Sequence, residues 1–145
     1  ITDTSPRTPI KLTLSERVPL VRADRDQLTQ VLLNLVQNAA QAAEGHRGDR
    51  GHVEVIVEPS GSGGVRVVVQ DDGPGIPLEE RSRVFEPYYT TKSGGTGLGL
   101  AIVDRIVSEH GGSIRLGESR WGGARFEIEL SPEGPIEDPE ASATT

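Results

Sequence analysis

The chain has 145 residues, of which 15 are basic and 22 acidic, giving a net charge of −7 at neutral pH, and it contains no cysteine. This length favours a single domain with its own core, and the missing cysteine excludes disulfides and thiolate metal sites. The negative charge disfavours nucleic acid and anionic membrane as partners. With no apolar stretch of roughly 18 residues and no signal peptide at the start, we expect a cytoplasmic domain; a longer protein that contained it could still carry a membrane anchor.

The first part of the chain predicts a linker, two strands and a helix. Residues 1–9 combine two prolines with threonine and serine, which is typical of a linker. Residues 10–14 alternate apolar and polar side chains and predict a strand, and residues 20–23 predict its partner. A helix is then expected from Asp24 to about Glu44, because the sequence begins with a capping box and stops at a glycine.

This first helix has an unusual polar face. Its apolar residues fill an arc of about 200° on a helical wheel, and the opposite arc of about 100° contains neutral amides and no charge. The amides are Gln27, Gln30, Asn34, Gln37, Asn38 and Gln41. Amide oxygens can coordinate a hard cation without bringing a full charge into a partly dry pocket. A merely polar surface stripe is the alternative.

The rest of the chain alternates strand pairs and helices. In order, we expect a hairpin of strands at 52–58 and 65–70, a short helix at 78–85 and a longer helix at 98–109. A closing strand pair is expected at 113–116 and 124–130. Residues 132–145 are rich in proline, glutamate, serine and threonine and are expected to be disordered. Helices between hairpins predict an α/β (α+β) two-layer sandwich, a mixed sheet with helices on one face.

Two glycine-containing segments hold residues that we expect to bind a ligand. Residues 67–70 form an apolar strand that runs into Asp71, Asp72, Gly73 and Gly75. A carboxylate at a buried strand end can accept a hydrogen bond from an exocyclic amine, and the glycines let a flat ring lie against the backbone. An ordinary Asp-Gly turn is the alternative.

The second segment places Gly95, Gly97 and Gly99 at alternate positions before a helix. This arrangement directs backbone N–H groups and the positive end of the helix dipole at an anion such as phosphate. A flexible linker is the alternative, although the alternating leucines continue into the helix. The segment matches neither the dinucleotide-binding fingerprint nor the P-loop.

Four motifs then occur in a fixed order, at residues 34–39, 71–75, 85–92 and 95–99. They resemble the N, G1, F and G2 boxes of histidine-kinase catalytic domains in the GHKL nucleotide-binding superfamily, closest to the nitrogen-regulator type. Residues 122–126 resemble the closing glycine box. The resemblance covers residues 10–131 and implies a Bergerat-type fold.

The resemblance also implies a site for ATP and Mg²⁺. Asn38 would hold the metal that bridges the phosphates, and Asp71 would bind the adenine amino group. The implied nucleotide-binding residues are Asn38, Asp71, Gly73, Gly75, Ile76, Thr91, Gly95, Thr96, Gly97, Leu98 and Gly99. Lys92, in a mobile lid at about 86–94, would contact phosphate, with a solvated loop lysine as an equal alternative.

One residue favours a kinase over an ATPase. GHKL ATPases have a glutamate one helical turn before the metal-binding asparagine as general base for water, and here that position is Asn34. We expect Asn34 and Lys92 to be the residues nearest the chemistry. Relative to many family members, Gln41 and Ala42 replace a basic and an aromatic residue, which leaves one phosphate contact and one ring stack unsupported.

No histidine in the chain resembles a phosphoacceptor. His46 and His52 flank a loop, and His110 ends a helix, where a protonated ring would suit the dipole. The resemblance therefore implies a separate helical dimerisation and histidine phosphotransfer domain as partner, with a response-regulator receiver domain downstream. A non-catalytic ATP-sensing module and a GHKL-type ATPase are the alternatives. We expect Phe85, Tyr88 and Tyr89 to dock the helical domain, with local core packing as the alternative for Phe85.

Overall fold

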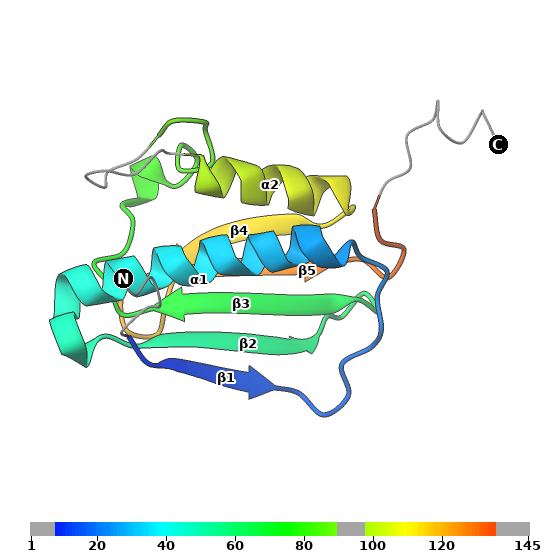
Figure 1. The fold of residues 1–145 in the computed structure, drawn as a ribbon, viewed down its shortest axis with the longest axis horizontal. Coiled ribbons are helices and arrows are strands. Elements are labelled where there is room, and N and C mark those ends of the chain that lie inside the picture. Colours follow the sequence, from blue (N-terminus) through cyan, green and yellow to red (C-terminus); the bar gives the residue numbers. More distant parts are fainter. Residues whose placement is uncertain (1–7, 90–97, 136–145) are drawn as a thin grey trace, which may run out of the picture.

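The computed structural model describes residues 8–89 and 98–135, which form one mixed sheet covered by two helices (Figure 1). The strands are β1 (Ile10–Leu14), β2 (Val53–Pro59), β3 (Val65–Asp71), β4 (Ser113–Glu118) and β5 (Ala124–Leu130). They lie in the order β1-β2-β3-β5-β4, with β1 parallel to β2 and the other neighbours antiparallel. The predicted two-layer sandwich with a mixed sheet is confirmed.

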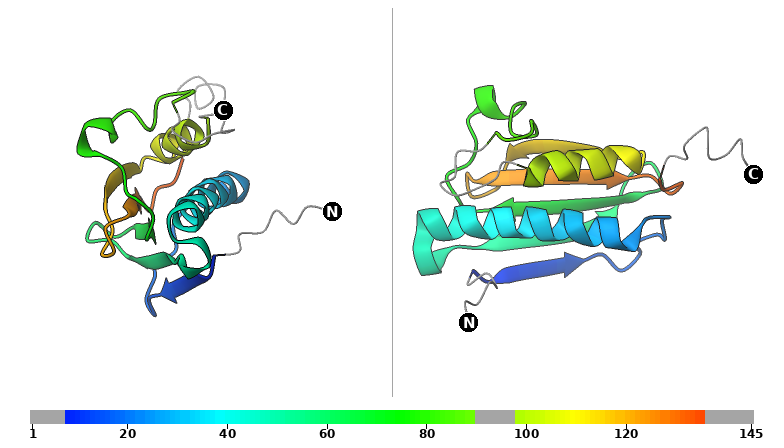
Figure 2. Two further views of the ribbon diagram at one scale, coloured as in Figure 1. Left: turned by 90° about the vertical axis from the view of Figure 1, so that its left-hand side faces the viewer. Right: turned by 45° about the horizontal axis from the view of Figure 1, so that its top comes forward.

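Both helices lie on the same face of the sheet (Figure 2). They are α1 (Arg25–Arg47) and α2 (Gly99–Glu109), and two short 3₁₀ helices occur at Gly48–Arg50 and Leu78–Glu80. α1 packs over β2 and β3, and α2 packs beside α1 and over β4. The segments of α1, β3 and α2 that carry the predicted motifs therefore lie on elements that pack against one another across the two layers.

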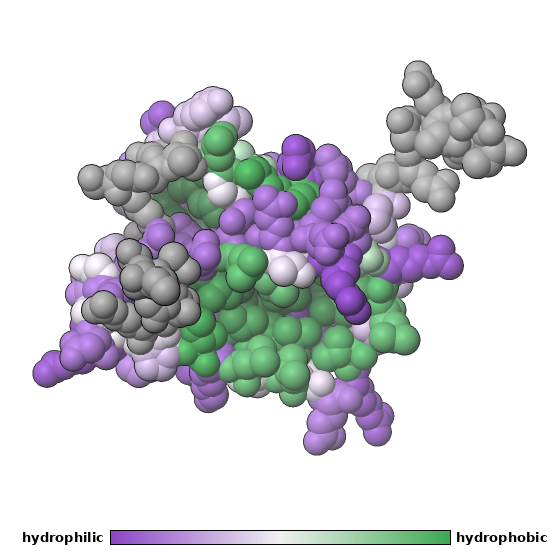
Figure 3. All heavy atoms as spheres, viewed as in Figure 1, coloured by the Kyte–Doolittle hydropathy of each residue, from purple (hydrophilic) through white to green (hydrophobic). Residues whose placement is uncertain are grey.

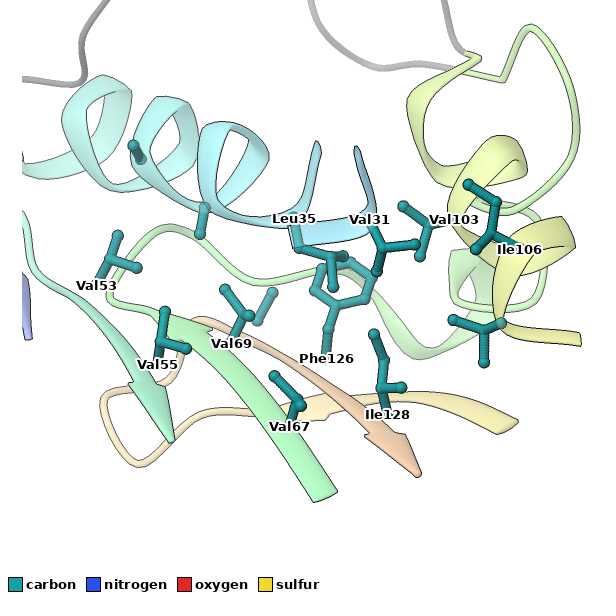
Figure 4. Packing of buried hydrophobic residues seen from close by; sticks show 14 of the residues in the cluster. Val31, Leu35, Val53, Val55, Val67, Val69, Val103, Ile106, Phe126 and Ile128 are labelled. Carbon is teal, nitrogen blue, oxygen red and sulfur yellow. The ribbon is translucent and has the colours of Figure 1, made fainter. Parts of the chain in front are cut away.

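The core fills the space between the helices and the sheet. Leu35 and Val31 of α1 point towards the ring of Phe126 on β5 (Figure 4), and all three are buried. On β5 the buried residues alternate with partly exposed ones, as expected for a strand with one covered face. This packing holds α1 on the sheet and thereby fixes the position of its polar face.

The helix side of the sheet is not completely covered. Ile10, Leu12 and Leu14 of β1 pair in parallel register with Val53, Val55 and Val57 of β2 and face the same side. The β2 residues belong to the core or pack against it, whereas those of β1 are exposed, because α1 lies over β2 and β3. Apolar surface is visible where β1 emerges from beneath α1 (Figure 3).

α1 begins as predicted and ends later than predicted. The carboxylate of Asp24 accepts a hydrogen bond from the backbone N–H of Gln27 at 3.0 Å and caps the helix. Gly45 does not stop α1, since a glycine inside a helix costs only about 1 kcal/mol. The helix continues to Arg47, where Gly48 adopts a φ of 62° and donates its N–H to the carbonyl of Glu44.

Two other predicted elements differ in the structure. The strand predicted at 20–23 is wrong: Leu20 is 98% exposed, and the N–H of Arg22 bonds to the carbonyl of Pro132 rather than to a neighbouring strand. The helix predicted at 78–85 is also wrong. That segment contains the 3₁₀ helix Leu78–Glu80 and then successive turns with three-residue hydrogen-bond spacing, which do not continue into an α-helix.

The domain limits expected at residues 9 and 131 stay a prediction. The carbonyl of Pro9 accepts a hydrogen bond from Val53 N–H, and Thr8 is buried. At the other end, Gly134 lies so close to the backbone of Arg22 that a Cβ there would contact it at 2.5–2.8 Å. Residues 1–7 and 136–145, expected to belong to the linker and the tail, lie outside the described residues. Within the described residues no helix has the length and apolar composition needed to cross a membrane.

The packing of α1 predicts a difference between two neighbouring leucines. Leu35 is completely buried, so Leu35→Ala should lower the free energy of unfolding by about 3 kcal/mol through lost contacts and a cavity. Leu33 is 54% exposed, so Leu33→Ala should change it by less than about 0.5 kcal/mol. Urea unfolding of both variants measures this, and equal losses would contradict the described orientation of α1.

Candidate nucleotide site

Asp71 ends β3 and is the most strongly constrained polar residue of the candidate site. Its side chain is 1% exposed, and its Oδ1 accepts hydrogen bonds from the N–H groups of Gly73 at 2.9 Å and Ala124 at 3.2 Å. Both bonds go to the same oxygen and come from different segments of the chain. These two bonds to Oδ1 fix the orientation of the whole carboxylate. They thereby also fix the position of Oδ2.

The turn between β4 and β5 is fastened to the backbone of Asp71 by Ser119. The Ser119 hydroxyl donates to the carbonyl of Asp71 at 2.6 Å and accepts the N–H of Gly123 at 2.9 Å. A Cβ on Gly123 would overlap the carbonyl oxygen of Asp71, so only glycine allows this approach. Sequence reasoning identified the glycine pair of this turn but missed Ser119, whose signal is a hydroxyl residue shortly before the pair.

Gly73 and Gly75 are needed for backbone packing around Asp71. A Cβ on Gly73 would lie 2.9 Å from the backbone carbon of Ala42 in α1 and also 2.9 Å from Asp71 Oδ1. Gly75 has a φ of 78°, and a Cβ there would lie 2.9 Å from the carbonyl oxygen of Gly122. The two glycines thus bring the segment after β3 between α1 and the β4–β5 turn. Ile76 follows and packs, partly buried, against the core.

The second aspartate of the motif has a structural role. Asp72 Oδ1 accepts the N–H of His52 at 2.8 Å, and its Oδ2 lies 3.2 Å from His52 Nδ1. The Asp72 carbonyl also accepts a hydrogen bond from Arg47 Nε at 3.2 Å. Asp72 therefore joins the end of β3 to the start of β2 and the end of α1, which leaves Asp71 as the aspartate directed at the site.

The amide face of α1 is only partly buried. Gln30, Gln37 and Gln41 are exposed, whereas Asn34 and Asn38 are partly covered. The side-chain N–H of Asn34 donates to the carbonyl of Gly99, the first residue of α2, at 3.4 Å. Asn34 thus connects α1 to the start of α2, and Asn38 lies one turn further along the same face.

The start of α2 is described only from Leu98 onward. Gly99 is the first helical residue, and among the described residues a Cβ there would meet only Asn34 Cγ, at 3.9 Å. The remaining residues predicted to hold phosphate lie outside the described residues: Thr91, Lys92, Gly95, Thr96 and Gly97. The structure therefore places Asn38 in the helix layer beside the start of α2 and Asp71 at the end of β3 in the sheet, and it gives no position for Lys92.

The aromatic residues before the undescribed segment separate into two groups. Phe85 is partly buried and meets Phe126 edge to face, with ring centroids 6.2 Å apart, which supports local core packing. Tyr88 is 76% exposed with a φ of 67°, and the Arg83 guanidinium lies 5.0 Å from the ring centre of Tyr89. Burial, followed by a side-chain hydrogen bond with Glu80, raises the pKa of the Tyr89 phenol.

Comparison with known proteins gives consistent matches. A family model described as histidine kinase-, DNA gyrase B-, and HSP90-like ATPase matches residues 23–134. The sensor histidine kinase ZraS of Escherichia coli O157:H7 is 43% identical over 131 residues, which cover 90% of this chain and 28% of ZraS. The sensory histidine kinase/phosphatase NtrB of Rhodobacter capsulatus is 44% identical over 128 residues, covering 83% of this chain and 36% of NtrB. The chain thus spans about a third or less of the length of these relatives.

Solved structures of sensor kinases have the same fold. The mycobacterial sensor histidine kinase MprB superposes with a TM-score of 0.75 at 32% identity, over 90% of this chain and 86% of that one. The nucleotide-free catalytic domain of histidine kinase ThkA gives 0.73 at 38% identity, over 86% and 80%. Full-length ShkA in complex with AMPPNP gives 0.76 at 35% identity, over 93% of this chain and 28% of ShkA.

The Ser119 contact can be tested by its effect on stability. Ser119→Ala removes these two bonds and the one that the Trp121 N–H donates to the same hydroxyl at 3.3 Å, and it leaves the buried N–H of Gly123 without this acceptor, so the free energy of unfolding should fall by about 1–3 kcal/mol. The exposed Ser108 of α2 is a matched control, and Ser108→Ala should change it by less than about 0.5 kcal/mol. Chemical denaturation of the two variants checks this, and an undiminished stability of Ser119→Ala would show that the turn is held by other contacts.

Proposed function

Because this chain belongs to the family of histidine kinase-, DNA gyrase B- and HSP90-like ATPases, we propose that it binds Mg·ATP and donates the γ-phosphoryl group to a histidine on a separate domain. The observation that carries the proposal is the arrangement along one face of α1. Asn34 contacts Gly99 at the start of α2, and Ala42 lies against Gly73, next to Asp71. Asn38 lies midway between these two contacts, which are about 12 Å apart at 1.5 Å per residue, a span that a nucleoside triphosphate can bridge.

The purine end of this span is assigned to Asp71. A carboxylate fixed by two backbone N–H groups is a directional acceptor for the exocyclic amine of adenine. The backbone of Gly73 and Gly75 lies beside it without side chains, so a flat ring can approach. Guanine would present a carbonyl oxygen where adenine presents the amine, and a carboxylate disfavours that oxygen. Asp71 would therefore select the adenine base.

The phosphate end is assigned to Asn38 and the start of α2. Mg²⁺ prefers oxygen ligands and is commonly held by one or two protein groups together with substrate phosphates. Among residues 8–89 and 98–135 no three histidine or acidic side chains gather at a potential metal site, so a single amide oxygen fits this mode of binding. When bound, Mg²⁺ would neutralise phosphate charge, and the N-terminus of α2 would add its dipole.

The reaction we propose is transfer rather than hydrolysis. A histidine imidazole nitrogen forms a bond to the γ-phosphorus, the bond between that phosphorus and the β,γ-bridging oxygen breaks, and ADP leaves. Asn34 takes the position where an ATPase needs a carboxylate base, and its amide donates a hydrogen bond to Gly99. We therefore interpret Asn34 as a group that positions the start of α2. Lys92 stays a proposed phosphate contact.

The partners follow from the length of the relatives. The matched segments make up only 28% of ZraS and 36% of NtrB, which leaves room in these relatives for further domains. We propose that the phosphoacceptor is a helical dimerisation domain of the same full-length kinase, and that a response-regulator receiver domain takes the phosphoryl group from it. The exposed ring of Tyr88 is available for docking, whereas Phe85 serves the core.

Two adjacent aspartates provide a test of the proposed function. Asp71→Asn places an amide where adenine needs an acceptor, so Mg·ATP affinity and phosphoryl transfer to an added helical histidine domain should fall at least about tenfold. Asp72→Asn is the control, because Asp72 bonds His52, and should lower stability while ATP affinity stays within about twofold. Calorimetry and transfer of radiolabel from [γ-³²P]ATP measure these effects. Tight ATP binding without transfer would instead support an ATP-sensing module, and hydrolysis by the isolated chain would support an ATPase.

The metal ligand is tested by Asn38→Ala. If Asn38 holds Mg²⁺, the wild type should bind ATP more tightly with magnesium than with EDTA, and this gain should disappear in the variant while Mg-free affinity is retained. Gln37→Ala, at the exposed neighbouring position, should keep the full gain. A magnesium dependence that is the same in Asn38→Ala and the wild type would reject this ligand.

A further inference from the structure

His110 directly follows α2 and is buried, with 1% of its surface exposed. Its Nε2 accepts the backbone N–H of Asp24 at 3.0 Å, and its Nδ1 lies 2.8 Å from the carbonyl oxygen of Ile106. A backbone N–H can only donate and a carbonyl oxygen can only accept, so Nδ1 carries the proton and Nε2 the lone pair. A ring protonated at both nitrogens, which the end of a helix would suit, offers no acceptor for the N–H of Asp24.

This hydrogen bond ties the start of α1 to the end of α2. At the other end of the pair, Asn34 donates to the carbonyl of Gly99. The two ties are separated by about 15 Å along α1 and about 16 Å along α2 at 1.5 Å per residue. These lengths agree only when the two helices run in opposite directions in one axial register. A shift of either helix along its axis changes the geometry of both bonds.

His110 itself cannot move easily, because the chain after it is locked to the sheet. Gly111 has a φ of 70°, and a Cβ on Gly112 would overlap the carbonyl oxygen of Glu129 in β5. The N–H of Gly112 also donates to the carbonyl of Val107 at 2.9 Å. The position of the imidazole is therefore fixed relative to the sheet, and the N-cap residue of α1 is hydrogen-bonded to it.

We propose that His110 is a positioning residue of the nucleotide site: as a neutral hydrogen-bond acceptor it holds the N-cap of α1 and sets the register of α1 against α2. This inference rests on the proposed function, because the register determines how Asn38 on α1 faces the phosphate-binding start of α2. Asp71 stands on β3 and is linked to α1 through the contact of Gly73 with Ala42, whereas Asn38 is part of α1 itself. Loss of the tie therefore changes the metal and phosphate end of the site more than the purine end.

Two pairs of variants separate the tie from general stability. His110→Asn keeps a donor near the Nδ1 position and loses the acceptor for Asp24, whereas His110→Gln retains an acceptor near the Nε2 position. Asp24→Pro removes the N–H donor and Asp24→Ala does not, while both lose the side-chain cap. Proline is compatible with the φ of −80° at this position.

The measurement is the ratio of the affinity for Mg·ATP to that for Mg-free ADP, determined by calorimetry well below the melting temperature of each variant. His110→Asn and Asp24→Pro should lower this ratio about tenfold, as expected for a displacement of the order of 1 Å. His110→Gln and Asp24→Ala should keep it within about twofold. A ratio unchanged in both His110→Asn and Asp24→Pro, whatever their melting temperatures, overturns the inference. If the wild type binds neither nucleotide, the proposed function itself fails, which is a distinct result.

The tautomer gives an independent readout in the unmodified protein. Long-range ¹H–¹⁵N NMR spectra of the histidine rings should show His110 neutral with the proton on Nδ1 at neutral pH, both with and without nucleotide. A proton on Nε2 would be incompatible with the bond to Asp24 N–H and would also overturn the inference.

Discussion

The two hydrogen bonds that fix the carboxylate of Asp71 are the interactions on which the rest of the candidate site depends. Burying a charge is costly unless hydrogen bonds replace water, and here the N–H groups of Gly73 and Ala124 supply them from segments far apart in the chain. The same arrangement forces the surrounding backbone together: Ser119 ties the β4–β5 turn to the Asp71 carbonyl, and Gly123 leaves no space for a side chain. The proposed selection of adenine requires a rigid group, and Asp71 is rigid because the sheet, the segment after β3 and the β4–β5 turn all hold it.

Several glycines that a motif would assign to ligand binding are explained first by protein packing. Gly73 touches Ala42 of α1, and Gly75 approaches the carbonyl of Gly122. These contacts join the helix layer, the segment after β3 and the closing turn around one point. The glycines therefore let three backbones meet, and under the proposed function the base would lie on the backbone surface that they leave without side chains. Ala42, where many family members carry an aromatic residue, lies at this meeting point.

The sequence alone predicted the features that depend on residues close together in the chain. Strand alternation, the Asp24 cap and the aspartate at the end of an apolar strand are local signals, and the structure contains all three. The end of α1 was missed because Gly45 and Gly48 have equal local propensity, and only Gly48 adopts a left-handed φ. The strand at 20–23 failed because strands need partners, and Arg22 finds its partner at Pro132. Ser119 and His110 could not be assigned in advance, since each bonds a residue on a distant element.

The choice between transfer and hydrolysis has a structural side as well as a chemical one. An amide at position 34 can donate to the carbonyl of Gly99, whereas an ionised carboxylate there would place two acceptors against each other. The residue that would activate water is thus incompatible with the contact that here joins α1 to α2. With Asn34, the helix pair is tied at both ends, at Gly99 and at His110. Under the proposed function, the amide that joins the helices therefore also stands where ATP hydrolysis would need a carboxylate base.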